Sequence, residues 1–290
     1  MVYILFFVLS FGTALVAVLQ KKYSKMTLYS VASGEFFLFV MSVVSVIFYA
    51  FSSGFAVVPN LPTLAYSAVL ALLAGASVIS AILALRQASV VTVSIFQNSG
   101  RIAIAYIFGI IFMQETVSVF NILACFIALF IAIQPIFSKD DKSKSTLIGY
   151  ILCLIIFFIA GSSSCLFKLY ATSTNVCSNS VLCFWANVFL IPYTVSSLIL
   201  KRKKTVKKTN NIGLKASSMA IIISVLNCAG TLLNIYILKN ISLTFYTIGS
   251  SSITLIFSAV LSVLFYGEQL TKKSVLTIIL SICSVILGAL

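Results

Sequence analysis

The chain is divided into apolar runs that each match the thickness of a lipid bilayer. A helix needs about 20 mostly apolar residues to cross the hydrocarbon core, and breaks with glycine, proline, asparagine or charge recur at that interval. The predicted spans are residues 2–20, 30–51, 61–85, 88–111, 117–137, 147–169, 179–200, 213–238, 243–266 and 272–290. We therefore expect an all-α integral membrane protein with ten transmembrane helices.

The composition agrees with this expectation and narrows the chemistry. Hydrophobic residues make up 61% of the chain and charged residues 8%, far from the shares found in soluble domains. Histidine is absent, and Asp plus Glu number only 5, which excludes histidine-ligated zinc sites, Ser-His-Asp triads and HExxH helices. We expect no enzyme activity, no catalytic residue, no metal and no cofactor.

A second constraint is an internal duplication, in which residues 85–133 resemble residues 238–286. In one register, 153 residues apart, the matched pairs include Leu85 with Leu238, Ser89 with Ser242, Ser99 with Ser252, Glu115 with Glu268 and Ile133 with Ile286. Weak similarity between halves of a membrane chain is typical of transporters built from repeats.

The duplication predicts the domain organisation. We assign residues 1–137 to a first five-span repeat, residues 138–146 to a linker and residues 147–290 to a second five-span repeat. Because five is odd, the second copy must begin on the opposite side of the membrane. The two halves should therefore be inverted repeats around a central cavity.

Basic residues gather in the breaks that follow the odd-numbered spans, whereas the opposite set of breaks holds Lys239 alone. Under the positive-inside rule, this bias predicts a multi-pass cell-membrane protein with both termini outside. Because the basic residues lie in these short breaks, we expect the net charge of +14 to serve contact with the anionic headgroups of the lipid bilayer, and not nucleic-acid binding. The sequence makes no prediction of an oligomeric state.

Arg101 falls near the middle of the predicted fourth span. Because a central arginine costs about 2.5–3.5 kcal/mol on insertion scales, its side chain should face a partner or water. Helical spacing places Ser94, Gln97 and Asn98 on the same face. The repeat offset gives the ninth span an equivalent polar face, made of Thr247, Ser250, Ser251 and Thr254.

Two interpretations of Arg101 remain open from the sequence. In the first, Arg101 only locks helices together through a carboxylate, and Glu35 is the acidic residue plainly inside a predicted span. In the second, Arg101 recognises an anionic group such as a carboxylate. Glu35 could then carry a coupling proton. Desolvation raises the pKa of a carboxyl group, whereas a nearby arginine lowers it.

The predicted eighth span carries a polar stripe of Asn227, Thr231 and Asn234. The repeat equivalents of these residues are apolar, namely Ala74, Val78 and Ala81. We therefore expect an asymmetric pocket whose polar contacts come mainly from the second half. Alternatively, the stripe cross-links helices by hydrogen bonds worth about 0.6 kcal/mol each.

Other polar and small residues favour structural roles. Lys168 is expected to extend toward the headgroups, Gly161 to permit close helix packing, and Trp185 to anchor at an interface or line the pocket. Glu115 and Glu268 each precede a predicted helix start, where a carboxylate meets the positive end of the helix dipole.

Two short turns resemble a known motif. Gly267-Glu268-Gln269-Leu270-Thr271 is similar to the glycine-glutamate turn of EamA-type repeats, and Met113-Gln114-Glu115-Thr116 is similar to a degraded copy of it. With the ten predicted spans, these turns resemble the drug/metabolite transporter superfamily. The resemblance implies a basket of helices around a cavity, with spans 4 and 9 near its centre, and alternating access. It also implies both termini in the cytoplasm for many bacterial members, contrary to the charge bias here.

Together these features predict a secondary active transporter of a small polar metabolite, such as an amino acid or an organic anion. Spans 1, 3, 4, 6, 8 and 9 should line its cavity. The expected substrate contacts are Arg101, Gln97, Asn98, Asn227, Asn234, Ser251 and Thr254, and a coupling proton is a further expected partner. The alternative is a non-transporting membrane scaffold or accessory subunit, whose polar faces would serve only helix packing.

Overall fold

The computed structural model describes residues 2–27, 33–88, 90–113, 147–204, 214–241 and 243–267, together with short stretches within 118–130 and 275–287. The long helices of this part are α1 (Val2–Met26), α2 (Ser33–Ser52), α3 (Leu61–Gln87), α4 (Val90–Met113), α6 (Leu147–Thr172), α7 (Asn179–Lys204), α8 (Leu214–Asn240) and α9 (Leu243–Tyr266). All eight are long and apolar enough to cross a membrane. The protein is therefore an all-α, multi-pass membrane protein over the part described.

Several sequence predictions lie outside these residues. The predicted fifth and tenth spans fall mostly in stretches that the structure does not describe, as do the linker at 138–146 and the two glutamates, Glu115 and Glu268. Eight of the predicted spans thus correspond to helices whose ends differ from the prediction by a few residues.

Local sequence signals set the helix ends. At the start of α3, the Asn60 side chain accepts a hydrogen bond of 3.0 Å from the Thr63 backbone N–H, and Pro62 occupies the first turn. The asparagine cap gives one backbone N–H group of the first turn a hydrogen-bond acceptor. Proline has no backbone N–H group, so it removes a second donor that would otherwise lack a partner. The turn before α3 places Gly54 and Phe55 at positive φ.

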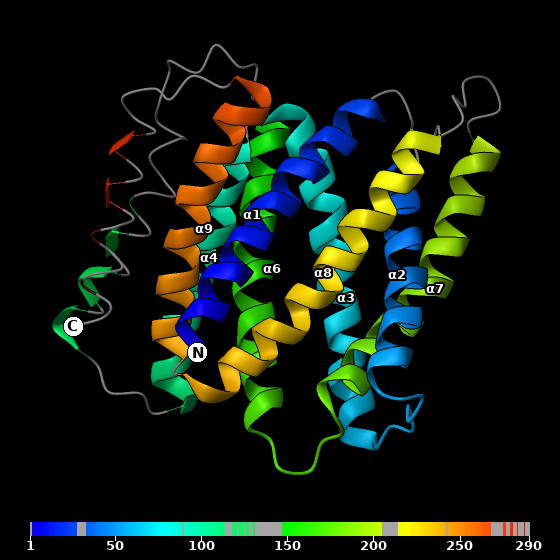
Figure 1. Ribbon diagram of the computed structural model, residues 1–290, viewed down its shortest axis with the longest axis horizontal. Helices are drawn as coiled ribbons and strands as arrows, with labels where there is room; N and C mark the ends of the chain where they lie inside the picture. The colour runs from blue at the N-terminus through cyan, green and yellow to red at the C-terminus, as the bar shows by residue number, and fades with distance from the viewer. Residues whose placement is uncertain are drawn as a thin grey trace.

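The helices stand side by side as one antiparallel bundle (Figure 1). We call the end where α1 finishes and α2 begins the upper end, as it is drawn. Four helices run toward this end, namely α1, α3, α7 and α9. The other four run away from it, namely α2, α4, α6 and α8. Helix α4 packs against α6 and α9, α1 against α8 and α9, α2 against α7 and α8, and α3 against α6 and α7.

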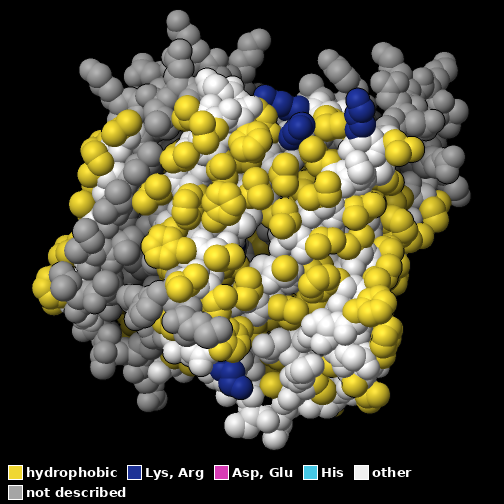
Figure 2. All heavy atoms as spheres, viewed as in Figure 1, with side chains coloured by type: hydrophobic (Ala, Val, Ile, Leu, Met, Phe, Trp, Pro, Cys, Tyr) yellow, Lys and Arg dark blue, Asp and Glu magenta, His cyan; other side chains and the backbone are white. Residues whose placement is uncertain are grey.

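Figure 2 shows a broad apolar belt between the two ends of the bundle, with basic side chains at the upper edge and a smaller group near the lower edge. The upper helix ends carry Lys21, Lys22, Lys25 and Arg86, whereas Lys239 lies at the lower end of α8. An apolar belt between charged rims is the surface expected of a bundle covered by lipid.

Helices α4 and α6 approach each other closely at two glycines. A Cβ atom at Gly100 would overlap the backbone carbonyl of Phe157, and one at Gly161 would lie 2.6 Å from the carbonyl oxygen of Gly100. Only glycine allows two backbones to approach this closely. The prediction that Gly161 permits close packing is therefore confirmed, and this crossing fixes the helix that carries Arg101.

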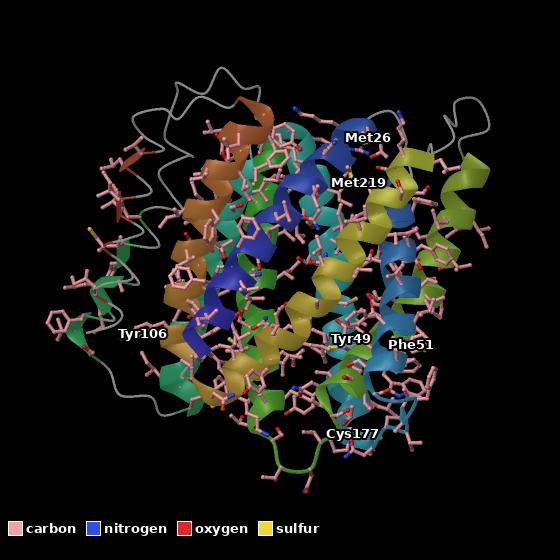
Figure 3. All side chains as sticks on the ribbon, viewed as in Figure 1. Met26, Tyr49, Phe51, Tyr106, Cys177 and Met219 are labelled. Atoms are coloured by element: carbon pink, nitrogen blue, oxygen red, sulfur yellow. The ribbon has the colours of Figure 1, made fainter. Side chains whose placement is uncertain are left out.

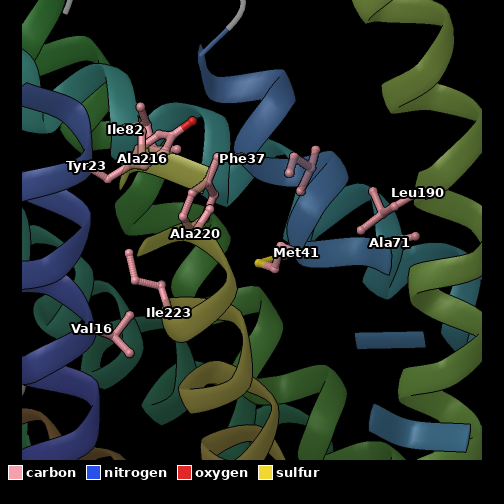
Figure 4. Packing of buried hydrophobic residues seen from close by; sticks show 11 residues of the cluster. Val16, Tyr23, Phe37, Met41, Ala71, Ile82, Leu190, Ala216, Ala220 and Ile223 are labelled. Atoms are coloured by element: carbon pink, nitrogen blue, oxygen red, sulfur yellow. The ribbon is translucent and has the colours of Figure 1, made fainter. Parts of the chain in front are cut away.

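Apolar clusters lie toward both ends of the bundle. Near the upper end, Tyr23, Phe37, Ile82 and Ala216 belong to one buried cluster (Figure 4). Near the lower end, Tyr170 packs with buried residues of α3 and α7. Figure 3 places Met26 and Met219 at the upper end and Cys177 at the lower end.

Candidate functional site

A cavity of about 260 Å³ lies between these two apolar clusters, within the bundle. Seven helices contribute to its described lining: α1, α2, α3, α4, α6, α7 and α8. The amide and charged side chains of the described lining are Gln20, Gln97, Arg101, Asn187, Asn227 and Asn234. All of these arise from helix interiors, so the cavity lies at the depth of the bilayer.

Arg101 extends into this cavity from α4, next to the glycine crossing. No hydrogen bond or ion pair joins its guanidinium to any residue that the structure describes, and the Tyr246 hydroxyl on α9 is an electrostatic neighbour. A positive charge without a counter-charge in an apolar setting attracts anions strongly, because the surrounding dielectric screens it little.

Glu35 is not the partner of Arg101. Its carboxylate is 6% exposed in the first turn of α2 and interacts electrostatically with Arg86 and Tyr23. Arg86 also donates to the Thr27 carbonyl at 3.0 Å and to the Ser33 hydroxyl, while the Tyr23 hydroxyl donates to the Ser33 carbonyl at 2.8 Å. The prediction that Glu35 pairs with Arg101 is therefore wrong. Glu35 lies at the upper end, where α2 begins, whereas Arg101 lies in the middle of α4.

The α8 stripe and its repeat equivalents face the same cavity. Asn227, Thr231 and Asn234 line it from α8, and the matching positions Ala74, Val78 and Ala81 line it from α3. The lining is therefore more polar on its α8 side than on its α3 side, where Ser77 is the polar residue among those described. The asparagines among the described lining residues, including Asn187, all come from the second half.

Three predicted contact residues lie elsewhere. Asn98, Ser251 and Thr254 are 2%, 1% and 4% exposed, and none of them belongs to the described lining of the cavity. The buried faces of α4 and α9 meet each other instead, as shown by the cluster that joins Ile95 to Leu255. Helix α9 therefore packs behind α4, and the expectation that it lines the cavity is wrong for the residues described.

Helices α2 and α7, which the sequence did not assign to the lining, take part in it. Ser45 and Tyr49 come from α2 and Asn187 from α7. Tyr49 donates to the Cys228 carbonyl at 3.4 Å, and Asn187 donates to the Cys183 carbonyl at 2.8 Å. An asparagine inside an apolar span was the one clear signal for α7; α2 offered only a serine and a tyrosine.

Lys168 and Trp185 have structural partners. The Lys168 ammonium donates to the carbonyls of Leu238 and Ile241 at 3.0 and 2.9 Å, so it caps the C-terminal end of α8 instead of extending to the headgroups. The Trp185 indole donates to the Val57 carbonyl at 2.8 Å, which anchors α7 to the turn between α2 and α3.

Comparison with known proteins identifies the second half of the chain. Residues 147–289 match the model of the EamA-like transporter family. This half is EamA-like. The resemblance to the drug/metabolite transporter superfamily is thereby confirmed for the part that contains α6 to α9 and the three asparagines of the cavity.

A likeness of fold to solved structures covers nearly the whole chain. One crystal structure is similar with a TM-score of 0.63 and 12% sequence identity, covering 96% of this chain and 95% of that one. In all, 26 chains of solved structures match. At such low identity the likeness concerns the fold alone. A search of curated proteins finds no match.

Proposed function

We propose that the protein is a secondary active transporter of a small, polar, anionic metabolite in the cell membrane, working by alternating access. The observation that carries this proposal is the Arg101 guanidinium, which faces a central cavity without a counter-charge among the residues that the structure describes. Binding an anion there would offset the cost of holding that charge inside the membrane.

The charge and size of the cavity support an anion of modest size. The described lining contains one arginine and no carboxylate. A volume of about 260 Å³ falls below the 300–1,000 Å³ or so of drug-sized pockets. A metabolite of a few carbon atoms fits this space better than a nucleotide or a large drug.

The helix arrangement supports ten spans in two inverted repeats. Each helix of the first half has a counterpart in the second half: α1 and α6, α2 and α7, α3 and α8, α4 and α9. The principal packing pairs are kept when every helix is replaced by its counterpart. The pair α4 and α6, for example, becomes α9 and α1, and the pair α3 and α7 becomes α8 and α2; both of these pairs are also in contact. Each helix also runs opposite to its counterpart (Figure 1). Inverted repeats are the usual basis of alternating access around a fixed site.

Glu35 is our candidate for a coupling-proton site. It is the single carboxylate among the described residues, it is buried, and it interacts electrostatically with Arg86 near the upper end of the bundle. Protonation there would change the contacts that hold the ends of α1, α2 and α3 together.

The test is binding followed by transport. The purified protein is screened by thermal shift against amino acids, organic acids, sugars, nucleosides and quaternary amines, and each hit is tested for counterflow in proteoliposomes. We expect anionic or zwitterionic hits that Arg101→Gln abolishes and that Lys239→Gln, which removes an exposed charge, preserves. Hits confined to neutral or cationic compounds would contradict the proposal. A non-transporting scaffold, by contrast, should bind none of the screened compounds, and such a protein does not need a polar cavity.

A further inference from the structure

We infer that an anionic phospholipid binds at the upper end of the seam between α1 and α9. Its phosphate lies between the ammonium groups of Lys21 and Lys25, and an acyl chain runs down the two helices. The site is on the outer surface of the bundle, away from the central cavity. The inference therefore does not depend on the ligand proposed for that cavity.

Two lysines of α1 converge on one tyrosine of α9. The ammonium groups of Lys21 and Lys25 lie 5.2 and 4.6 Å from the centre of the Tyr266 ring. The Tyr266 hydroxyl donates to the Val18 carbonyl at 2.7 Å, which holds the ring against α1. The seam thus has an aromatic base that is fixed to both helices, with two positive charges beside it.

Two like charges at one ring favour an anion that contacts both of them. Each ammonium is attracted to the face of the ring, but the ring has no net charge that could offset the repulsion between the two lysines. An ammonium has three N–H donors and no acceptor, and lysine is a common ligand of phosphate. The several oxygens of one phosphate group can accept from both side chains at once.

The seam below the lysines is lined with hydrocarbon. Phe11 of α1 and Phe257 of α9 meet edge to face, with ring centroids 5.4 Å apart. Leu15, Phe257 and Tyr266 pack partly buried against the same apolar cluster, while Phe11 and Leu264 are 43% and 73% exposed. Figure 2 shows the same order over the whole face, with basic side chains directly above an apolar belt. An acyl chain that extends from the phosphate therefore meets apolar side chains of both helices.

The charge of the site selects the headgroup. Phosphatidylcholine carries a cation of its own next to the phosphate, whereas phosphatidylglycerol carries only the negative charge. Two lysines therefore favour phosphatidylglycerol. The positive-inside bias assigns this end of the bundle to the cytoplasmic leaflet, where anionic lipids give the membrane a negative surface potential.

Native mass spectrometry of the purified full-length protein tests the inference. The protein is stripped of lipid and then supplied with equal amounts of phosphatidylglycerol and phosphatidylcholine that have identical acyl chains. We expect phosphatidylglycerol to be retained preferentially. Lys25→Gln should reduce the preference about fivefold, which corresponds to about 1 kcal/mol for one lysine near the membrane surface. The control is Lys215→Gln, which removes an exposed lysine at the start of α8, at the same end, and should leave the preference unchanged.

The aromatic base is tested by two substitutions at one position. Tyr266→Leu removes the ring, whereas Tyr266→Phe keeps the ring and removes only the hydrogen bond to Val18. We expect Tyr266→Phe to keep more of the preference for phosphatidylglycerol than Tyr266→Leu does. The melting temperature of each variant without lipid shows that it is folded.

A soluble phosphate separates a lipid site from a site for a free anion. We expect phosphatidylglycerol to raise the melting temperature of the unchanged protein more than glycerol 1-phosphate does at the same concentration, since the latter lacks acyl chains. Equal stabilisation by the two compounds would show that the site takes a free phosphate, and the lipid assignment would be wrong. Equal retention of the two lipids by the unchanged protein, or an equal effect of Lys25→Gln and Lys215→Gln, would also overturn the inference.

Discussion

At the scale of single residues, the molecule holds two arginines in opposite circumstances. Arg101 faces the cavity without a hydrogen bond or ion pair to any residue described, whereas Arg86 donates to Thr27 and Ser33 and lies in the field of Glu35. The first is available to a ligand, and the second holds helix ends together. Substitution of each should therefore change stability in opposite directions.

We expect Arg101→Leu to stabilise the ligand-free protein, by up to about 2.5–3.5 kcal/mol, because it removes a charge that costs that much near the bilayer centre. Ligand binding should be lost at the same time. The measurement is thermal unfolding in detergent, with and without a ligand identified by screening.

Arg86→Leu is the matched comparison and should destabilise the protein, because it leaves the Thr27 carbonyl and the Ser33 hydroxyl without their donor. Lost hydrogen bonds of this kind cost about 1–3 kcal/mol. If Arg101→Leu lowers the melting temperature as much as Arg86→Leu does, Arg101 acts as a structural lock and its assignment to ligand binding is wrong.

At the scale of helices, the crossing of α4 and α6 is the contact least able to adapt. Gly100→Ala would drive a methyl group into the Phe157 carbonyl, which belongs to backbone and cannot rotate away. We expect a loss of about 1–3 kcal/mol or more from overpacking, together with weaker ligand binding, since Arg101 is the next residue. Size-exclusion chromatography after heating measures the first effect.

Gly12→Ala provides the control for this substitution. A Cβ atom at Gly12 meets no other group within 4 Å, so the substitution should be neutral or stabilise α1 by up to about 1 kcal/mol through helix propensity. Equal effects of the two substitutions would show that α4 and α6 do not cross as closely as described.

The cap on α8 gives a second prediction at this scale. Lys168→Met should destabilise the protein by about 1–2 kcal/mol, since the carbonyls of Leu238 and Ile241 lose a charged donor at the negative end of the helix dipole. Lys239→Met, in the exposed last turn of the same helix, should change the unfolding temperature little. A null effect of Lys168→Met would place that ammonium in the headgroup region, as the sequence suggested.

The sequence predicts helix lengths better than helix rotation, and the candidate site shows why. Hydropathy located the eight spans that are described, and helical spacing placed Asn227 and Asn234 on the face that lines the cavity. The same spacing grouped Asn98 with Arg101, yet Asn98 faces away from the cavity. Which part of a polar face meets a neighbouring helix depends on how the helices pack, and periodicity within one helix does not contain that information.

At the scale of the whole molecule, the two ends of the bundle have related links between consecutive helices. Tyr23 near the end of α1 donates to the Ser33 carbonyl at the start of α2, and Tyr170 near the end of α6 donates to the Cys177 carbonyl just before α7. Lys21 and Lys168 stand two residues before these tyrosines. Among the described residues, the upper end alone also has the Arg86 and Glu35 charges, so the two ends should respond differently to salt.

The distribution of basic residues predicts which end faces the cytoplasm. In a variant without native cysteines, Thr174→Cys marks the lower end, in the turn between α6 and α7, and Met26→Cys marks the upper end, where α1 finishes. If the lysine-rich upper end is cytoplasmic, a membrane-impermeant maleimide should label Thr174→Cys in intact cells and Met26→Cys only after permeabilisation. The reverse pattern would place both termini inside, as in many bacterial members of the superfamily that the chain resembles. The charge of the loops would then not determine its orientation, and the upper end of the bundle, with Glu35 and Arg86, would face outward.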